Sequence, residues 1–191
     1  MSINIVAISG SLREGSWNTR LLRQAIGAAT ARQASVTHID LRELALPIFS
    51  EDLEAQGTPA AAARLKASMI AADALLFASP EYNSSMSAAL KNAIDWASRP
   101  AKGETPLAAF QGKVAGLFSA STGALGGLRG LVHLRAVLGN IGVLVLPEQL
   151  ALPKAQECFT PEGTLADPGT FRRLEGIVQR VIDVAGRLRT R

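Results

Sequence analysis

The chain has 191 residues, of which 48% are hydrophobic, 19% charged and 5% aromatic. This composition excludes a disordered or collagen-like chain, and the length suits one globular domain spanning residues 1–191. The single cysteine, Cys158, excludes an internal disulfide, and no apolar run approaches the ~20 residues that cross a bilayer. Because the first residues also lack the pattern of a signal peptide, we expect a cytoplasmic protein without membrane insertion.

The net charge of +4 comes from the C-terminal segment. Residues 171–191 contain six arginines against Glu175 and Asp183, which leaves the first 170 residues neutral overall. These arginines are spread along an expected helix with apolar residues between them, as on a solvated helix face. Since a nucleic-acid binder concentrates its basic residues in a reading element, we expect no nucleic-acid partner.

The N-terminal part of the chain predicts a strand, a helix and a second strand. Residues 3–8 are an apolar run that ends in turn residues, which is typical of a buried strand. A helix is expected over residues 18–30, because apolar side chains recur on one face and Asn18 can cap the first turn. Residues 35–40 predict the second strand.

The same alternation continues to the C-terminus. Strands are expected at 74–78, 113–119 and 141–146, and helices at 59–72, from Ser85 or Ser87 to 98, at 127–138 and at 168–188. Five strands that alternate with five helices predict an α/β fold, a doubly wound parallel sheet with helices on both faces. Ligands of such sheets bind at the carboxyl ends of the strands, so the loops after the first, third and fourth strands are the candidate sites.

The loop after the first strand, residues 10–19, is rich in hydroxyl and amide side chains and leads into a helix. Unpaired amides at a helix N-terminus favour an anion, and Arg13 adds a full positive charge. A phosphate site and an ordinary capped turn with a surface arginine both fit this composition. The loop lacks the G-x-G-x-x-G and G-K-[ST] patterns of nucleotide sites, and without a cysteine it excludes a thiolate phosphatase.

Two further loops complete the expected site. Residues 79–85 contain Tyr82, the only tyrosine of the chain, whose ring can pack on a planar ligand while backbone amides bind ring carbonyls and nitrogens. The alternative is a turn whose tyrosine covers the core. Residues 119–127 are small and permit close backbone approach to a ligand, although any flexible loop can have such a composition.

No residue pattern indicates a metal site or a nucleophile. His38 lies in an expected strand and His133 in an expected helix, which is too few for a metal cluster. Ser121 is outside the G-x-S-x-G pattern of hydrolases, and Cys158 lies away from the three loops. We therefore expect no metal and no catalytic side chain.

Together the three loops resemble the NADPH-dependent FMN reductase family of flavodoxin-like proteins, which includes bacterial quinone and chromate reductases. The matching segments are 10–13 with Ser16 and Asn18, then 80–83 followed by 90–96, and then 119–129. They occur in the family's order within about residues 3–150. The resemblance implies a flavodoxin-like five-stranded sheet of order 2-1-3-4-5.

The resemblance also implies which residues bind FMN. Those that hold its phosphate are Ser11, Arg13, Ser16, Asn18 and Thr19. Those that line the isoalloxazine edge, mostly through their backbone, are Pro80, Glu81, Tyr82, Asn83 and Ser84. Those that flank the ribityl chain and the pyrimidine side are Ser119, Thr122 and Gly123.

By the same resemblance the chain is an FMN-dependent NAD(P)H oxidoreductase. NADPH or NADH passes a hydride to N5 of the flavin, and a quinone, chromate, azo compound or free flavin then receives the electrons in ping-pong order. A homodimer or homotetramer is implied, and we hypothesise that Arg129 and Arg135 meet Glu148 across a subunit interface. Two alternatives remain: a flavodoxin-type electron carrier, whose acidic docking face this chain lacks, and a flavin-free scaffold.

Overall fold

Five parallel strands form the central sheet of the computed structural model, which describes residues 2–101 and 103–189. The strands are β1 (Asn4–Ser9), β2 (Ser35–Asp40), β3 (Ala74–Ala78), β6 (Val114–Ala120) and β7 (Leu144–Leu152). Their spatial order is β2-β1-β3-β6-β7, so these five strands, counted along the chain, follow the order 2-1-3-4-5. The α/β class, the parallel sheet and the strand order expected from the sequence are confirmed.

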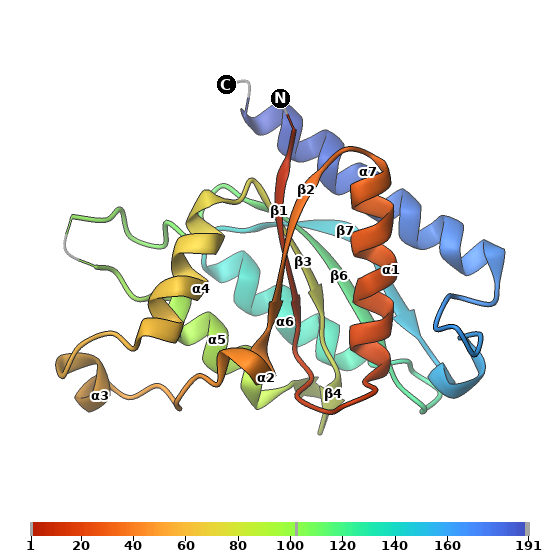
Figure 1. Ribbon diagram of the computed structural model, residues 1–191, viewed down its shortest axis with the longest axis horizontal. Coiled ribbons are helices and arrows are strands. Elements are labelled where there is room, and N and C mark those ends of the chain that lie inside the picture. The colour runs from red at the N-terminus through yellow and green to blue at the C-terminus, as the bar shows by residue number, and fades with distance from the viewer. Residues whose placement is uncertain (1, 102, 190–191) are drawn as a thin grey trace.

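Helices cover both faces of the sheet (Figure 1). One face carries α1 (Trp17–Ala31) and α7 (Pro168–Arg189), and the other carries α4 (Ala60–Ala71), α5 (Ala88–Ser98) and α6 (Leu128–Asn140). Successive strand residues point to opposite faces, so each strand serves two cores. In β1, Ile5 and Ala7 pack with the α1 and α7 layer, whereas Val6 and Ile8 pack with the opposite layer. No described helix is both long and apolar enough to cross a membrane.

Most element boundaries lie within two residues of those expected, and the starts of α1 and β7 show why they differ. The helix α1 begins at Trp17 and not at residue 18, because Ser16 is its N-cap and accepts a hydrogen bond from the amide of Thr19. The strand β7 begins at Leu144 and extends to Leu152, later and longer than the expected 141–146. The later start follows from Gly142, whose φ of +85° turns the chain between α6 and the strand.

The structure adds short elements that no periodicity predicts. They are α2 (Leu41–Leu44), α3 (Glu51–Ala55), the 3₁₀ turn η1 (Ala155–Glu157), and a hairpin of β4 (Glu81–Tyr82) and β5 (Ser85–Met86). The hairpin turn consists of Asn83 and Ser84, whose φ angles are +50° and +66°. Positive φ at both turn residues is the type I′ arrangement, which matches the twist of two antiparallel strands. Figure 1 shows β4 at the carboxyl edge of the sheet.

Candidate functional site

The loops at the carboxyl ends of β1, β3 and β6 surround a cleft of about 320 Å³. In an open sheet of this order the cleft lies at the switch point between β1 and β3, where ligands of doubly wound folds bind. The predicted site residues in its lining are Ser11, Arg13, Ser16, Asn18, Pro80, Glu81, Tyr82 and Thr122. All three loops that the sequence singled out therefore meet at one place.

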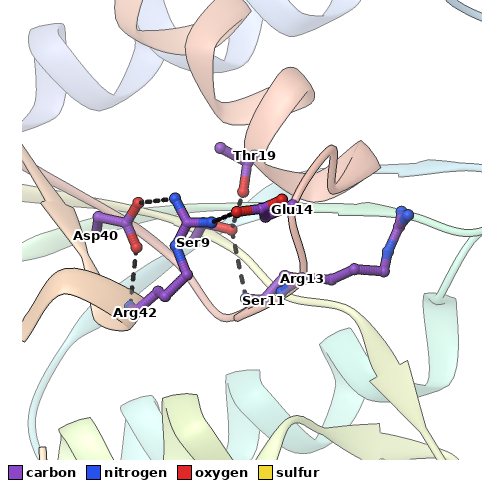
Figure 2. A network of polar contacts seen from close by, with 7 residues as sticks. All are labelled: Ser9, Ser11, Arg13, Glu14, Thr19, Asp40 and Arg42. Carbon is purple, nitrogen blue, oxygen red and sulfur yellow. Dashed lines mark hydrogen bonds and ion pairs between the residues drawn. The ribbon is translucent and has the colours of Figure 1, made fainter. Parts of the chain in front are cut away.

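The loop between β1 and α1 forms the polar end of the cleft. The Ser9 and Thr19 hydroxyls are 2.9 Å apart, and the Ser9 hydroxyl also accepts from the amide of Ser11 at 3.4 Å (Figure 2). Ser16 caps one amide of α1, and the other amides of the first turn have no acceptor within the helix. The positive end of α1 therefore borders the cleft.

Arg13 is exposed and forms no ion pair within the part of the chain that the structure describes. Figure 2 shows its side chain extending away from the neighbouring ion pairs. In these pairs Nη1 of Arg42 lies 3.0 Å from Oε1 of Glu14, and Nη2 lies 3.9 Å from Oδ2 of Asp40. Glu14 and Asp40 are thus both paired with Arg42 and not with Arg13, which leaves the Arg13 guanidinium available to an anion.

Asn18 connects two of the loops. It is buried, its side-chain nitrogen donates to the carbonyl of Ala120 at 2.8 Å, and its side-chain oxygen accepts from the Ala120 amide at 2.9 Å. The side chain therefore holds the start of α1 against the end of β6, where it also lines the cleft. This bond explains why Asn18 does not cap the helix.

The hairpin of β4 and β5 carries the Tyr82 ring into solvent at the cleft, with 54% of the residue exposed. The carboxylate of Glu81 is bound to the start of α6. Its Oε1 accepts from Nε of Arg129 at 2.9 Å and lies 2.7 Å from Nη2, and its Oε2 accepts from the Gly130 amide at 3.1 Å. Burial raises the pKa of Glu81, but the hydrogen bonds from Gly130 and Arg129 outweigh it, so the pKa lies below its usual value.

Both arginines of the hypothesis about carboxylates such as Glu148 have contacts within their own chain. Arg129 is paired with Glu81 of its own chain, and Arg135 donates to the carbonyls of Val145 and Pro147 and to the side chain of Gln149. A contact of either arginine with Glu148 of another subunit would add to these partners or replace them, and it stays a hypothesis.

Some predicted residues lie outside the lining of the cleft, namely Thr19, Asn83, Ser84, Ser119 and Gly123. Thr19 borders a second hollow of about 160 Å³ towards α2. Ser119 is fully buried, and its hydroxyl has no hydrogen-bond partner in the described chain. It lies directly against Gly127, where a Cβ would collide with the Ser119 oxygen. Ser119 thus lies below the start of α6, and its role beside the cofactor stays a prediction.

The lining also contains residues that sequence reasoning missed: Trp17, Ala120 and Ser121. The Trp17 ring stacks on Phe159 with 5.7 Å between ring centroids, and the Arg20 guanidinium lies 4.7 Å from its centre. Phe159 is far along the chain, so nothing in the sequence indicates that this stack forms. Ser121 was visible in the fourth loop, but only its position at the end of β6 places it in the cleft.

The described residues contain no cluster of histidine, cysteine or acidic side chains that can hold a metal. Burial, followed by the charges of Glu157 and Asp167, raises the pKa of the Cys158 thiol. This thiol donates to the carbonyl of Pro153 at 3.2 Å. A protonated thiol is a poor nucleophile, so these contacts give Cys158 no catalytic chemistry.

The donors of the cleft fit a phosphorylated planar cofactor. Hydroxyls, an unpaired arginine and a helix N-terminus suit a phosphate, while the hairpin edge and the small residues around Thr122 leave room for a ring system. A mononucleotide therefore fits this site. The sheet order and the site together define a flavodoxin-like protein of the class that binds a flavin mononucleotide.

Comparison with known proteins agrees with this class. The model of a family described as NADPH-dependent FMN reductase matches residues 3–157. An NAD(P)H-dependent FMN reductase of Pseudomonas aeruginosa is 42% identical over 167 residues, which cover 86% of this chain and 85% of the relative. An NADPH:quinone oxidoreductase of Arabidopsis thaliana is 38% identical over 182 residues, covering 92% of this chain and 88% of the relative.

A solved structure is also similar. The flavoenzyme FerB of Paracoccus denitrificans, an NAD(P)H:(acceptor) oxidoreductase, superimposes with a TM-score of 0.82 at 30% identity. The match covers 97% of this chain and 98% of FerB. This chain belongs to the NADPH-dependent FMN reductase family. The resemblance, the enzyme class, and the use of FMN with NAD(P)H as donor, all expected from the sequence, are confirmed.

Proposed function

We propose that this chain is an NAD(P)H-dependent quinone reductase whose FMN lies in the cleft at the carboxyl ends of β1, β3 and β6. The observation that carries the proposal is the unpaired Arg13 beside the free N-terminal amides of α1, at the point where the strand order reverses. Relatives named as quinone oxidoreductases support a quinone as the acceptor.

The residues of the cleft divide between the two ends of the cofactor. Ser11, Arg13, Ser16 and the first amides of α1 hold the phosphate, and Thr19 supports them through its bond to Ser9. Asn18 acts on the phosphate indirectly, by fixing the start of α1 to β6. The hairpin edge at Pro80, Glu81 and Tyr82, with Asn83 and Ser84 at its turn, borders the isoalloxazine ring.

Held by Ser11, Arg13 and the first amides of α1, FMN would supply the redox chemistry, which is hydride acceptance at N5 with NADPH or NADH as donor and electron transfer to the acceptor in ping-pong order. The protein contributes position and donors, and no side chain acts as a nucleophile or as a metal ligand. Thr122 and the neighbouring small residues keep the rim open above the ring. An open rim admits quinones, chromate, azo compounds and free flavin alike.

We propose further that residues 1–191 act as one domain in the cytoplasm, as a homodimer or a homotetramer. Both cores lie on one sheet, which supports a single domain. The large apolar side chains of Leu125, Leu128 and Val132 are between 41% and 56% exposed, at the start of α6 and just before it. Exposed apolar side chains gathered on one element are typical of a contact between subunits.

Steady-state turnover tests the proposed activity. The protein loaded with FMN is assayed with NADPH and with NADH against a quinone, chromate, an azo dye and free FMN. We expect parallel double-reciprocal plots and quinone turnover. A protein that binds FMN but does not lose its visible flavin absorbance with either nucleotide is an electron carrier, and a protein that binds no FMN is a scaffold. Either result contradicts the proposal.

A further inference from the structure

The carboxylate of Glu81 is held by groups on α6, although the same residue lines the cleft. Its side chain is only 10% exposed and lies next to two donors of Arg129 and the amide of Gly130. The Arg129 side chain is itself 59% exposed, so this ion pair joins a buried carboxylate on the hairpin to an arginine at the surface.

The start of α6 is shaped to receive the hairpin backbone. Gly130 has no side chain, and a Cβ there would lie 3.3 Å from Cβ of Glu81 and 3.1 Å from the carbonyl oxygen of Ser85. Gly127 precedes the helix with a φ of +88°, which allows the chain to turn tightly over Ser119. Because Gly127 and Gly130 have no side chains, β4 and β5 pack directly against the start of α6.

The same place is an anion site by its chemistry. A helix N-terminus carries a partial positive charge and unpaired amides, and a guanidinium adds a full charge. Here the chain fills that site with its own carboxylate. A hairpin with two residues in each strand is not stable by itself, so its position depends on such a contact.

We propose that Glu81 is a positioning residue: its carboxylate, bound by Arg129 and the Gly130 amide, fixes the 81–86 hairpin so that the cleft offers a preformed edge to the flavin ring. The part of this proposal that concerns the flavin rests on the proposed function. The part that concerns the hairpin applies to the protein without FMN. The two parts are therefore tested separately.

Tyr82 reports on the hairpin because it is the only tyrosine of the chain. In protein labelled with ¹³C-tyrosine and free of FMN, one ring signal follows residue 82 by NMR. We expect Glu81→Gln, which keeps the size and removes the charge, to shift and broaden that signal. The matched control is Glu43→Gln on α2, which changes an exposed carboxylate in the same way and should leave the signal unchanged.

FMN titration tests the link to the cofactor. We expect Glu81→Gln to raise the FMN dissociation constant about tenfold, since the edge of the variant is no longer preformed and has to be ordered on binding. Arg129→Gln should act in the same direction. The double variant should bind FMN no more weakly than Glu81→Gln alone, because both changes break one contact.

Chemical rescue separates positioning from a general loss of structure. Glu81→Ala removes a fragment the size of acetate, so acetate is expected to restore both the Tyr82 signal and FMN affinity, whereas chloride at equal ionic strength is not. If Glu81→Gln does not fold, Arg129→Gln at the surface carries the same test. An unchanged Tyr82 signal, or a loss that acetate does not restore, overturns the inference. Wild-type protein that binds no FMN overturns the proposed function, and the Tyr82 measurement still decides the role of Glu81.

Discussion

Arg13 is the residue on which the proposed phosphate site depends most. The polar groups in and around its loop already have partners: Ser9 with Thr19, Ser16 with the first turn of α1, and Arg42 with the acidic side chains. Arg13 alone among them brings a full charge that no described residue neutralises. The sequence predicts Arg13 as a phosphate ligand because a loop between a strand and a helix ends at a helix N-terminus, and this role stays a prediction.

Arg13→Ala is expected to weaken FMN binding without unfolding the protein. A charge-assisted hydrogen bond contributes ~1.5–3 kcal/mol, so the FMN dissociation constant should rise about tenfold to hundredfold. Fluorescence titration measures this constant, and urea unfolding should change by less than ~0.5 kcal/mol because the side chain is exposed. Arg180→Ala on the exposed side of α7 is the control and should leave both unchanged. Unaltered FMN affinity in Arg13→Ala would refute the phosphate assignment.

At the scale of elements, each helix end needs partners for its last carbonyls. Lys113, buried just before β6, meets this need for α4, because its ammonium donates to the carbonyls of Ile70 at 3.1 Å and Ala72 at 2.5 Å. Burial lowers the pKa of Lys113, and the nearby Asp73 charge opposes that shift. In the unfolded chain Lys113 keeps its proton up to a pKa near the ordinary value of 10.5, whereas in the folded protein it loses the proton at a lower pH. Between these two pH values the unfolded chain binds more protons, so the free energy of unfolding rises with pH.

Lys113→Met is expected to destabilise the fold by ~1–3 kcal/mol, because it leaves buried carbonyls without a donor. It should also remove the increase in stability at alkaline pH. Urea unfolding at neutral pH and near pH 10 measures both effects. The control is Lys91→Met, which removes an exposed ion pair with Asp95 on α5 and should change stability by about 0.5 kcal/mol or less. Equal losses in the two variants would contradict the capping role.

For the whole molecule, the sheet order brings three loops to one edge, and the apolar side chains near the start of α6 lie outside both cores. If this face joins subunits, Val132→Glu places a charge in the contact. We expect sedimentation to show the wild type as a dimer or tetramer and this variant as a monomer. Ile48→Glu, at an even more exposed apolar residue, is the control and should leave the assembly intact. A wild type that stays monomeric at all concentrations would contradict the proposed assembly.

The sequence by itself determined the class of fold and the place of the site. Apolar runs alternating with amphipathic segments require a parallel sheet covered on both faces, and such a sheet collects its ligand loops at one edge. Short-range signals therefore sufficed to single out the loop of Arg13 and to limit the start of α5 to Ser85 or Ser87, of which Ser87 is the N-cap. The I′ turn at Asn83 and Ser84 carried no such signal, since serine is uncommon at positive φ.

Only the tertiary structure decided which polar side chains of the site bind groups of their own chain. Asn18 meets Ala120 across 102 residues of chain, Glu81 meets Arg129 across 48, and Ser119 is buried against Gly127. Each of these side chains looked like a ligand donor in the sequence. A polar side chain binds its own chain when packing places a partner from a distant part of the sequence within about 3 Å of it, and otherwise it can bind a ligand. The local sequence pattern carries no information on that distance.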